Sequence, residues 1–377
     1  MKVWIRQVMA YRHPVYSPMP FPVPGWMWDR PVGIEQYDER LAYIRRLEAL
    51  GFDGAIFTEH HYGTIGGLTP SPNIMLAAAT QLTERIALVT MGNILTLHAH
   101  PVRLAEELAM LDNLSHGRLV AGFVSGNEEA HYAYSVRPQE ARGRQQEAYA
   151  LIHRAWTDEN PFEWRGEYFQ YDCVSILPRP FQTPHPPVWT SGLSAETLEW
   201  AARNRIGLVA SGTVEQAGKA LDYYRQYAAA HCDWRPAATS LGLSRELMVL
   251  PTMAQAREFA ERLYGRDRQD HRGQSFTIPH LDDLTRQRYT ARSYEYLGGD
   301  PGDFAARAGN SFEEMQANGT YVVGDPDSVA EQLVRQQQML GAGVLIVRPE
   351  LTGMPLEDVL AGLERFAREV LPTLQAL

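Results

Sequence analysis

The feature that most constrains the fold of this chain is a regular alternation of short apolar runs with amphipathic segments. Nearly every apolar run is followed by a segment with helical periodicity, such as 34–51, which ends at Gly51. Eight strand–helix units are the count of a closed TIM (βα)8 barrel, although a doubly wound open sheet would show the same local alternation. The strand count and the length of 377 residues favour the α/β barrel, as a single domain over 1–377. The eight predicted strands lie at 3–10, 54–60, 86–95, 117–126, 187–192, 206–212, 238–250 and 343–350.

Two segments interrupt this alternation. The loop at 11–33 is rich in proline and aromatic residues, so that Trp26 and Trp28 are predicted to form a substrate wall at the barrel mouth. A structural brace over the barrel edge is the alternative for this loop. The segment 264–310, after the seventh strand, is long, polar and charged. We predict that it is a lid insertion that keeps water from the reaction, with an inert surface insertion as the alternative.

Charge and cysteine content exclude several classes of protein. The net charge of −10, with 35 basic and 45 acidic residues, argues against a nucleic-acid or anionic-membrane partner. The two cysteines give neither a disulfide framework nor metal-ligand spacing, which predicts a reducing compartment and no metal site. The first apolar stretch contains Arg6 and Gln7, unlike a signal peptide, and no apolar window is long enough for a membrane helix. The sequence therefore predicts a soluble, cytoplasmic protein.

The motif TEHHYG at 58–63 places a carboxylate and two imidazoles at the end of the second predicted strand. In a TIM barrel the carboxyl ends of the strands form the active-site face. His60 is predicted to be the catalytic acid–base group, because an imidazole titrates near neutral pH. Glu59 and His61 are expected to orient it, and His61 is also placed among the substrate-contacting residues with Trp26 and Trp28. A purely structural role at the strand end is the alternative.

A candidate anion site follows the fifth predicted strand. Ser194 and Thr197 open a helix there, so their hydroxyls and the free N–H groups of the first turn can hold a phosphate. The alternative is that Ser194 only caps the helix. Arg142 and Arg144 open another helix and are candidates for a cationic contact, or else belong to a solvated helix face. Gly92 interrupts an apolar strand, which indicates that a ligand or another backbone approaches closely.

Four segments together resemble the bacterial luciferase-like flavin monooxygenases. The first is Glu59-His60-His61, and the most specific is TMGNILTLHAHPVRLAEELAMLDNLSHGRLVAGFVSG at 90–126. The others are PPVWTSGLSAETLEWAARN at 186–204 and GDPDSVAEQL at 324–333. The resemblance covers most of the chain except 11–33 and 264–310.

The resemblance implies a flavin site and an assembly. It implies a non-prolyl cis peptide at Gly92–Asn93 against the flavin, for which a β-bulge is the alternative. It also implies a homodimer packed through the helices at 72–83 and 102–115, with Met75, Leu76, Leu104, Leu108 and Leu111 at the interface unless these side chains pack inward. The FMN-binding residues that it implies are Gly92, Asn93, Val124, Arg142, Ser194 and Thr197.

The activity implied by the resemblance is that of a two-component monooxygenase. Reduced FMN (FMNH2) from a separate NAD(P)H:flavin reductase would react with O2 to a C4a-(hydro)peroxyflavin, which hydroxylates or oxygenates a small organic substrate. The chain departs from the luciferases at Val124, Ser125 and Leu193, where they carry a thiol, an arginine and a carboxylate, so light emission is not expected. A deazaflavin-dependent hydride-transfer enzyme and a non-catalytic flavin-binding relative are the alternatives. The substrate, the type of oxygenation and the reductase stay open.

Overall fold

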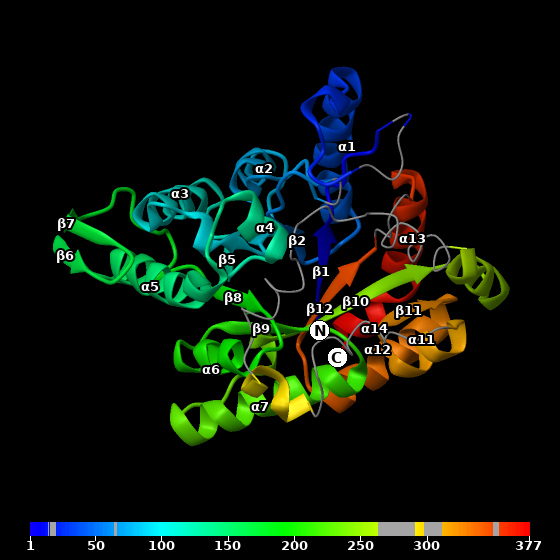
Figure 1. Cartoon of the computed structure of the whole chain (residues 1–377). Helices are drawn as coiled ribbons and strands as arrows, with labels where there is room; N and C mark the ends of the chain where they lie inside the picture. The colour runs from blue at the N-terminus through cyan, green and yellow to red at the C-terminus, as the bar shows by residue number, and fades with distance from the viewer. Residues whose placement is uncertain (14, 16–19, 64–65, 263–290, 298–310, 350–353) are drawn as a thin grey trace.

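Eight parallel strands close into a barrel, which confirms the predicted TIM-barrel fold (Figure 1). The computed structural model describes residues 1–13, 15, 20–63, 66–262, 291–297, 311–349 and 354–377. In ring order the strands are β1 (Lys2–Gln7), β2 (Gly54–Phe57), β3 (Ala87–Thr90), β5 (Leu119–Val124), β8 (Val188–Ser191), β9 (Gly207–Ala210), β10 (Leu241–Val249) and β12 (Val344–Arg348). All eight match predicted apolar runs.

The ring closes where β12 pairs with both β1 and β10. Lys2 of β1 pairs with Val344, and Gly242 of β10 pairs with the same residue from the other side. Two short strands outside the ring pair with barrel strands: β4 (Asn93–Ile94) pairs with the end of β5, and β11 (Tyr321–Gly324) pairs with the second half of β10. The sequence did not predict β11, because four apolar residues directly before a helix also fit a loop.

Helices cover the outside of the barrel and follow the strands in the chain (Figure 1). The connection from β5 to β8 contains the antiparallel hairpin of β6 (Phe162–Arg165) and β7 (Gln170–Val174). Residues 253–262 are also helical. The helices are α1 (Arg30–Ala49), α2 (Pro72–Thr80), α3 (Pro101–Leu114), α4 (Glu128–Ala133), α5 (Pro138–Thr157), α6 (Ala195–Arg203), α7 (Val214–His231), α11 (Phe312–Asn318), α12 (Pro326–Leu340), α13 (Leu356–Glu369) and α14 (Leu371–Gln375); the short 3-10 helices are η1 (Gly25–Met27), η2 (Leu95–Leu97), η3 (Ala238–Ser240) and η4 (Ala291–Leu297).

Apolar side chains fill the inside of the barrel. The rings of Trp4 and Trp189 lie 5.0 Å apart, centroid to centroid, and meet edge to face. Packed side chains in a TIM barrel exclude a pore, so a ligand site has to lie at the mouth. The buried cluster inside the ring consists of Trp4, Ile56, Val89, Val120, Trp189, Val209, Val344 and Ile346.

The structure overturns the prediction of which side chains form a dimer interface. Met75, Leu76, Leu104, Leu108 and Leu111 are all buried within the chain, because they occupy the faces of α2 and α3 that pack on the barrel. The inward-packing alternative is therefore right for these five residues. The exposed apolar side chains of the same two helices are Ile74, Met110 and Leu114.

Most of the predicted lid, 264–310, lies outside the described residues, apart from 291–297. Among the described helices, none combines the length and the apolar character that a membrane-spanning segment requires.

Candidate active site

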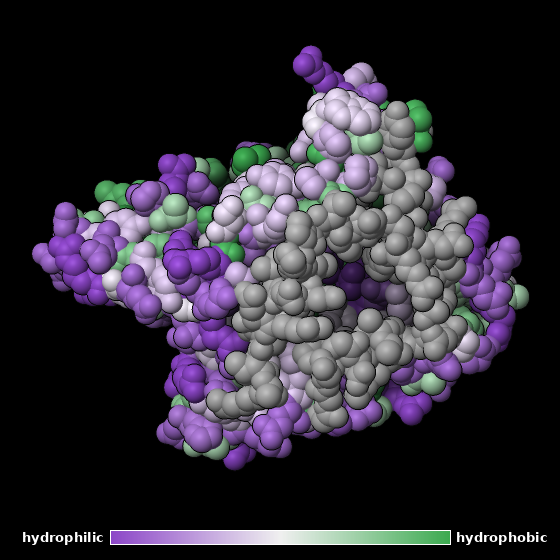
Figure 2. All heavy atoms as spheres, viewed as in Figure 1, coloured by the Kyte–Doolittle hydropathy of each residue, from purple (hydrophilic) through white to green (hydrophobic). Residues whose placement is uncertain are grey.

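A pocket with a cavity volume of about 250 Å³ opens at the carboxyl ends of the barrel strands. Figure 2 shows a hollow in the middle of this face of the molecule, with hydrophilic residues at its bottom. Apolar side chains of the barrel interior, Ile56, Val209 and Ile346, also line this pocket. The pocket therefore lies directly above the packed barrel interior. Its other lining residues are Arg6, Thr58, Glu59, His60, Met91, Gly92, Ile94, Val124, Ser125, Gly126, Asn127, Ser191 and Ser244.

His60 lines the pocket, as predicted for a reacting group. Its backbone N–H donates to the carbonyl of Thr69 at 3.2 Å, which folds the following loop back over β2. Gly66 of this loop has φ +70°, and a Cβ there would lie 2.4 Å from Cδ2 of His60. Burial, together with the charges of Arg6, His61 and Arg348, lowers the pKa of His60 to about 4. The imidazole is therefore neutral at neutral pH and can accept a proton or donate a hydrogen bond, but it is not an imidazolium acid.

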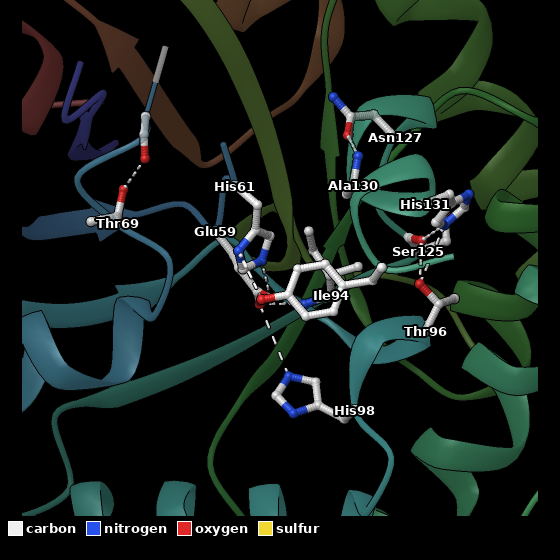
Figure 3. Close-up of polar contacts among 12 residues, drawn as sticks. Glu59, His61, Thr69, Ile94, Thr96, His98, Ser125, Asn127, Ala130 and His131 are labelled. Atoms are coloured by element: carbon white, nitrogen blue, oxygen red, sulfur yellow. Dashed lines mark hydrogen bonds and ion pairs between the residues drawn. The ribbon is translucent and has the colours of Figure 1, made fainter. Parts of the chain in front are cut away.

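Glu59 and His61, the chain neighbours of His60, belong to a hydrogen-bonded network in which Figure 3 shows Glu59 between His61 and Ile94. Nε2 of His61 lies 3.0 Å from Oε1 of Glu59, and Nδ1 of His61 lies 3.2 Å from the hydroxyl of Tyr134. The other oxygen of Glu59 accepts the N–H of Ile94 at 2.8 Å. Glu59 therefore ties the chain after β2 to β4, and the role of Glu59 and His61 in orienting His60 or the loop stays a prediction. His61 is buried in this network and does not line the pocket, so its substrate contact stays a prediction.

Gly92 forms part of the pocket wall where two backbones approach closely. A Cβ on Gly92 would lie 2.8 Å from the carbonyl oxygen of Gly122 on β5. The predicted cis bond at Gly92–Asn93 is wrong by one position, because the non-prolyl cis bond joins Met91 and Gly92. Asn93 belongs to β4 and pairs with Phe123 of β5, so the chain has to turn before the Gly92–Asn93 peptide.

Two other predicted cofactor residues lie near Gly92. Val124 lines the pocket. Asn93 is buried beside it in β4, and its Nδ2 has no hydrogen-bond partner among the described residues.

A second, smaller pocket, with a cavity volume of about 80 Å³, adjoins the first, since Ser125 and Ser191 line both. It brings together the predicted anion-binding residues Arg142, Ser194 and Thr197. Ser194 caps α6: its Oγ accepts the N–H of Thr197 at 3.3 Å and lies 2.8 Å from the hydroxyl of Thr197. The cap and the anion site are therefore compatible.

The cation of this second pocket is partly neutralised. Arg142 lies 3.2 Å from the carboxylate of Glu196, which also accepts a hydrogen bond from the hydroxyl of Ser293 at 3.0 Å. Ser293 belongs to η4, and its neighbour Tyr294 lines the pocket. The described part of the predicted lid thus packs beside this second pocket.

The structure does not bring Trp26 and Trp28 to the described pockets. Trp26 is exposed, and Trp28 packs on Tyr11, with ring centroids 5.0 Å apart, and on Gly33 of α1. This placement agrees with the brace alternative for the loop, and a substrate contact for both residues stays a prediction.

Arg6 and Thr58 are among the pocket residues that sequence reasoning did not single out. In the sequence, Arg6 stood out only as a charge within the first predicted strand. The signal that could have identified it is its position two residues after Trp4. Residues two apart on a strand point to the same face, so Arg6 points into the ring as Trp4 does.

Most of the chain is similar to proteins of one family. Residues 20–343 match the model of the luciferase-like monooxygenases. An uncharacterised protein of Sinorhizobium fredii is 33% identical over 215 residues, covering 57% of this chain and 62% of the relative. The oxygenase component of a flavin-dependent trigonelline monooxygenase of Acinetobacter baylyi is 29% identical over 171 residues, covering 45% and 46%. The matches thus span about half of the length of these curated relatives.

Solved structures match over nearly their full length. The monooxygenase RslO1 of Streptomyces bottropensis has a TM-score of 0.76 at 25% identity, covering 99% of both chains. The oxygenating constituent of 3,6-diketocamphane monooxygenase of Pseudomonas putida, solved with FMN, has a TM-score of 0.74 at 19% identity, covering 99% and 98%. The coenzyme F420-dependent tetrahydromethanopterin reductase of Methanopyrus kandleri has a TM-score of 0.63 at 16% identity, covering 98% of both chains. The last two share the fold.

Proposed function

We propose, from the premise that the chain belongs to the luciferase-like monooxygenase family, that it uses reduced FMN and O2 to oxygenate a small organic substrate. The observation that carries this proposal is the pair of adjoining pockets, one at the barrel mouth and one at the start of α6. FMN has the matching shape, because a flat ring system is joined to a phosphate through a flexible chain.

The residues present fit the cofactor at both ends. At the ring end, the absence of a side chain on Gly92 leaves a wall of backbone and of Val124, against which a flat ring can lie. At the phosphate end, Ser194 and Thr197 offer hydroxyls at the first turn of α6, and Arg142 offers a guanidinium. Among the described residues that line this second pocket, Arg142 is the one cation, and Glu196 pairs with it. That balance favours the single phosphate of FMN over the longer acidic tail of a deazaflavin.

The chain's own residues would position the reactants. Bound reduced FMN would supply the two electrons that O2 activation requires. His60 presents a neutral imidazole to the pocket and can take a proton from a substrate. Glu59 and His61 keep the end of β2 fixed to β4, so that the distance between the imidazole of His60 and the backbone at Gly92 stays constant. The apolar floor of Ile56 and Ile346 keeps water from the inner side of the pocket.

The supply of reduced flavin would come from a separate NAD(P)H:flavin reductase. The trigonelline relative is named as an oxygenase component, which supports a division of labour between two proteins. We also propose that the protein works as a homodimer, with Ile74, Met110 and Leu114 on its interface, because these apolar side chains of α2 and α3 are exposed.

The proposal is tested by mixing the protein with reduced FMN without oxygen, and then adding ¹⁸O2 with a panel of organic compounds. We expect a stoichiometric complex with reduced FMN, and one ¹⁸O atom in a product of the panel, detected by mass spectrometry. Failure to bind reduced FMN would contradict the proposal, and so would a bound flavin that releases only peroxide with every compound.

A further inference from the structure

The pocket at the barrel mouth has two unlike sides. Met91 and Gly92, between β3 and β4, form an apolar and backbone side with Ile94 of β4 and Val124 of β5. Arg6 of β1 forms a polar side with Thr58 and His60, which follow the end of β2. We call these three residues the polar wall.

Sheet order places the polar wall away from the phosphate pocket. In the closed ring, β1 and β8 are four strands apart, and thus lie on opposite sides of an eight-stranded barrel. The phosphate pocket lies beyond the end of β8, at Ser191 and the start of α6. A flavin held by its phosphate there and by the Gly92 wall leaves the polar wall for the second ligand. The proposed acid–base role of His60 also requires the substrate to lie within hydrogen-bond reach of its imidazole.

The strand register brings the members of the polar wall together. Arg6 pairs with Ile56 across β1 and β2, and Thr58 follows Ile56 by two residues, so both side chains enter the ring from neighbouring strands. Thr58 is 4% exposed, and its hydroxyl has no hydrogen-bond partner among the described residues. A buried hydroxyl that lines a pocket and lacks a partner is expected to bond a ligand.

The charges around the polar wall favour an anion. Burial lowers the pKa of His60 most, and the positive charges of Arg6 and Arg348 lower it further. Arg348 is paired with Glu246 at 2.9 Å. The carboxylate of Glu59 is engaged by His61 and by the N–H of Ile94. Arg6 is the member of this group whose guanidinium lines the pocket itself.

We propose that the polar wall binds the carboxylate of an organic acid, with Arg6 supplying the charge and Thr58 a hydroxyl donor. The inference rests on the proposed function in one respect, since it names the substrate class of the same site. Arginine suits this role because its planar fork can donate two parallel hydrogen bonds to a carboxylate. The carboxylate would hold the organic acid beside His60 and against the flavin.

The test uses FMN-loaded protein and matched probes that differ only in charge: benzoate with benzamide, and acetate with acetamide. Binding is measured by calorimetry for the parent, Arg6→Gln, Thr58→Val and Thr58→Ser. We expect at least one acid to bind about tenfold more tightly than its amide, and this preference to disappear in Arg6→Gln. Thr58→Val should weaken acid binding by several fold, whereas Thr58→Ser, which keeps the hydroxyl, should retain it. Arg165→Gln, at the exposed hairpin, is the matched control and should change nothing.

A second readout reports directly on the polar wall. Because Arg6 lowers the pKa of His60, Arg6→Gln should raise that pKa, and a bound carboxylate should raise it in the parent. Histidine NMR signals measure both shifts. The inference is overturned if no acid is preferred over its amide, or if the preference survives in Arg6→Gln. It is equally overturned if Arg6→Gln weakens FMN binding and leaves acid binding intact, because the guanidinium then serves the flavin.

The outcomes separate this inference from the proposed function. If the protein prefers the acids through Arg6 but oxygenates no compound, the carboxylate site is supported and the proposed function is contradicted. If the protein oxygenates neutral compounds and shows no preference for acids, the proposed function is supported and the carboxylate site is contradicted.

Discussion

The guanidinium of Arg142 and the carboxylate of Glu196 lie 3.2 Å apart within the pocket proposed for the FMN phosphate. A phosphate that enters this pocket meets a cation and an anion at once. We expect Glu196→Gln to tighten FMN binding by about three- to tenfold, because the substitution removes a negative charge beside a dianion. The amide oxygen of glutamine can still accept the hydrogen bond from Ser293, which preserves the contact with η4.

Riboflavin supplies the control for this prediction, since it has the same ring and no phosphate. Fluorescence titration should show that Glu196→Gln leaves riboflavin affinity unchanged. If FMN binds the variant more weakly than the parent, Glu196 serves to orient Arg142 and the electrostatic argument is wrong.

The hydroxyls at the start of α6 should contribute to FMN affinity independently of that charge. A hydrogen bond to a charged group contributes about 1.5–3 kcal/mol, so Ser194→Ala with Thr197→Ala should weaken FMN binding at least tenfold. Riboflavin binding should change little. Ser194 is also the N-cap of α6, and its loss costs about 1 kcal/mol of stability. Thr213→Ala, which removes the N-cap of α7 away from the site, is the matched control for that cost. Equal FMN binding by the double variant and the parent would remove the anion site from the proposal.

The barrel could be predicted from the sequence because its strands are buried on both faces and read as continuous apolar runs. The anion site could be predicted for a similar reason, since a strand followed by Ser194 and Thr197 fixes the helix start that holds them. Both features depend on residues that are adjacent in the chain.

The parts that sequence reasoning did not identify depend on residues that are distant in the chain. Arg6 and Thr58 share one wall only because β1 and β2 pair in a particular register. The cis bond lies at Met91–Gly92 because β4 begins at Asn93, and the pairing of β4 with β5 is not visible in a single segment. Trp26 and Trp28 looked like a substrate wall from composition alone, whereas their positions follow from the packing of Trp28 on α1.

Protonation of His60 should make the folded protein less stable in mild acid. Burial, aided by the charge of Arg6, lowers the pKa of His60 from 6.5 to about 4. The unfolded chain therefore binds a proton below about pH 6.5 that the folded chain binds only near pH 4. This contribution to stability is fully present above pH 6.5 and falls as the pH falls toward 4, by about 2 kcal/mol between pH 8 and pH 5.

Urea unfolding of the parent and of His60→Gln at pH 8 and pH 5 measures that contribution. The comparison has to be made with the variant, because burial also lowers the pKa values of His98 and His153, which destabilise both proteins in acid. The parent should lose about 2 kcal/mol more than His60→Gln over this range. Equal losses would mean that His60 titrates normally in the folded protein.

Gly122 should tolerate no side chain, because β3 and β5 approach each other most closely there. A Cβ on Gly122 would lie 1.9 Å from the carbonyl oxygen of Thr90. Thr90 Oγ1 also accepts the N–H of Gly122 at 2.8 Å, which holds the two backbones together. We expect Gly122→Ala to lower the free energy of unfolding by about 3 kcal/mol or more, since the strands have to separate.

The control for this prediction is Gly25→Ala, where a Cβ would meet no atom within 4 Å. Its unfolding midpoint in urea should match that of the parent. A small effect of Gly122→Ala would show that the strands can shift without loss of packing.

The last prediction concerns assembly through α2 and α3. Ile74 is 71% exposed on α2, and Met110 and Leu114 are 51% and 41% exposed on α3. These two helices pack against each other, so the three side chains lie on neighbouring elements of one surface. A two-fold interface places the same surface of two copies face to face, and burial of such side chains is what stabilises it.

We expect the parent to sediment as a dimer, and Ile74→Glu with Met110→Glu to sediment as a folded monomer, because two charges per subunit would be buried without partners. Ile34→Glu is the matched control, since Ile34 is a similarly exposed apolar residue on α1 and should leave the dimer intact. A parent protein that stays monomeric at every concentration, or a control that dissociates as fully as the double variant, would exclude this interface.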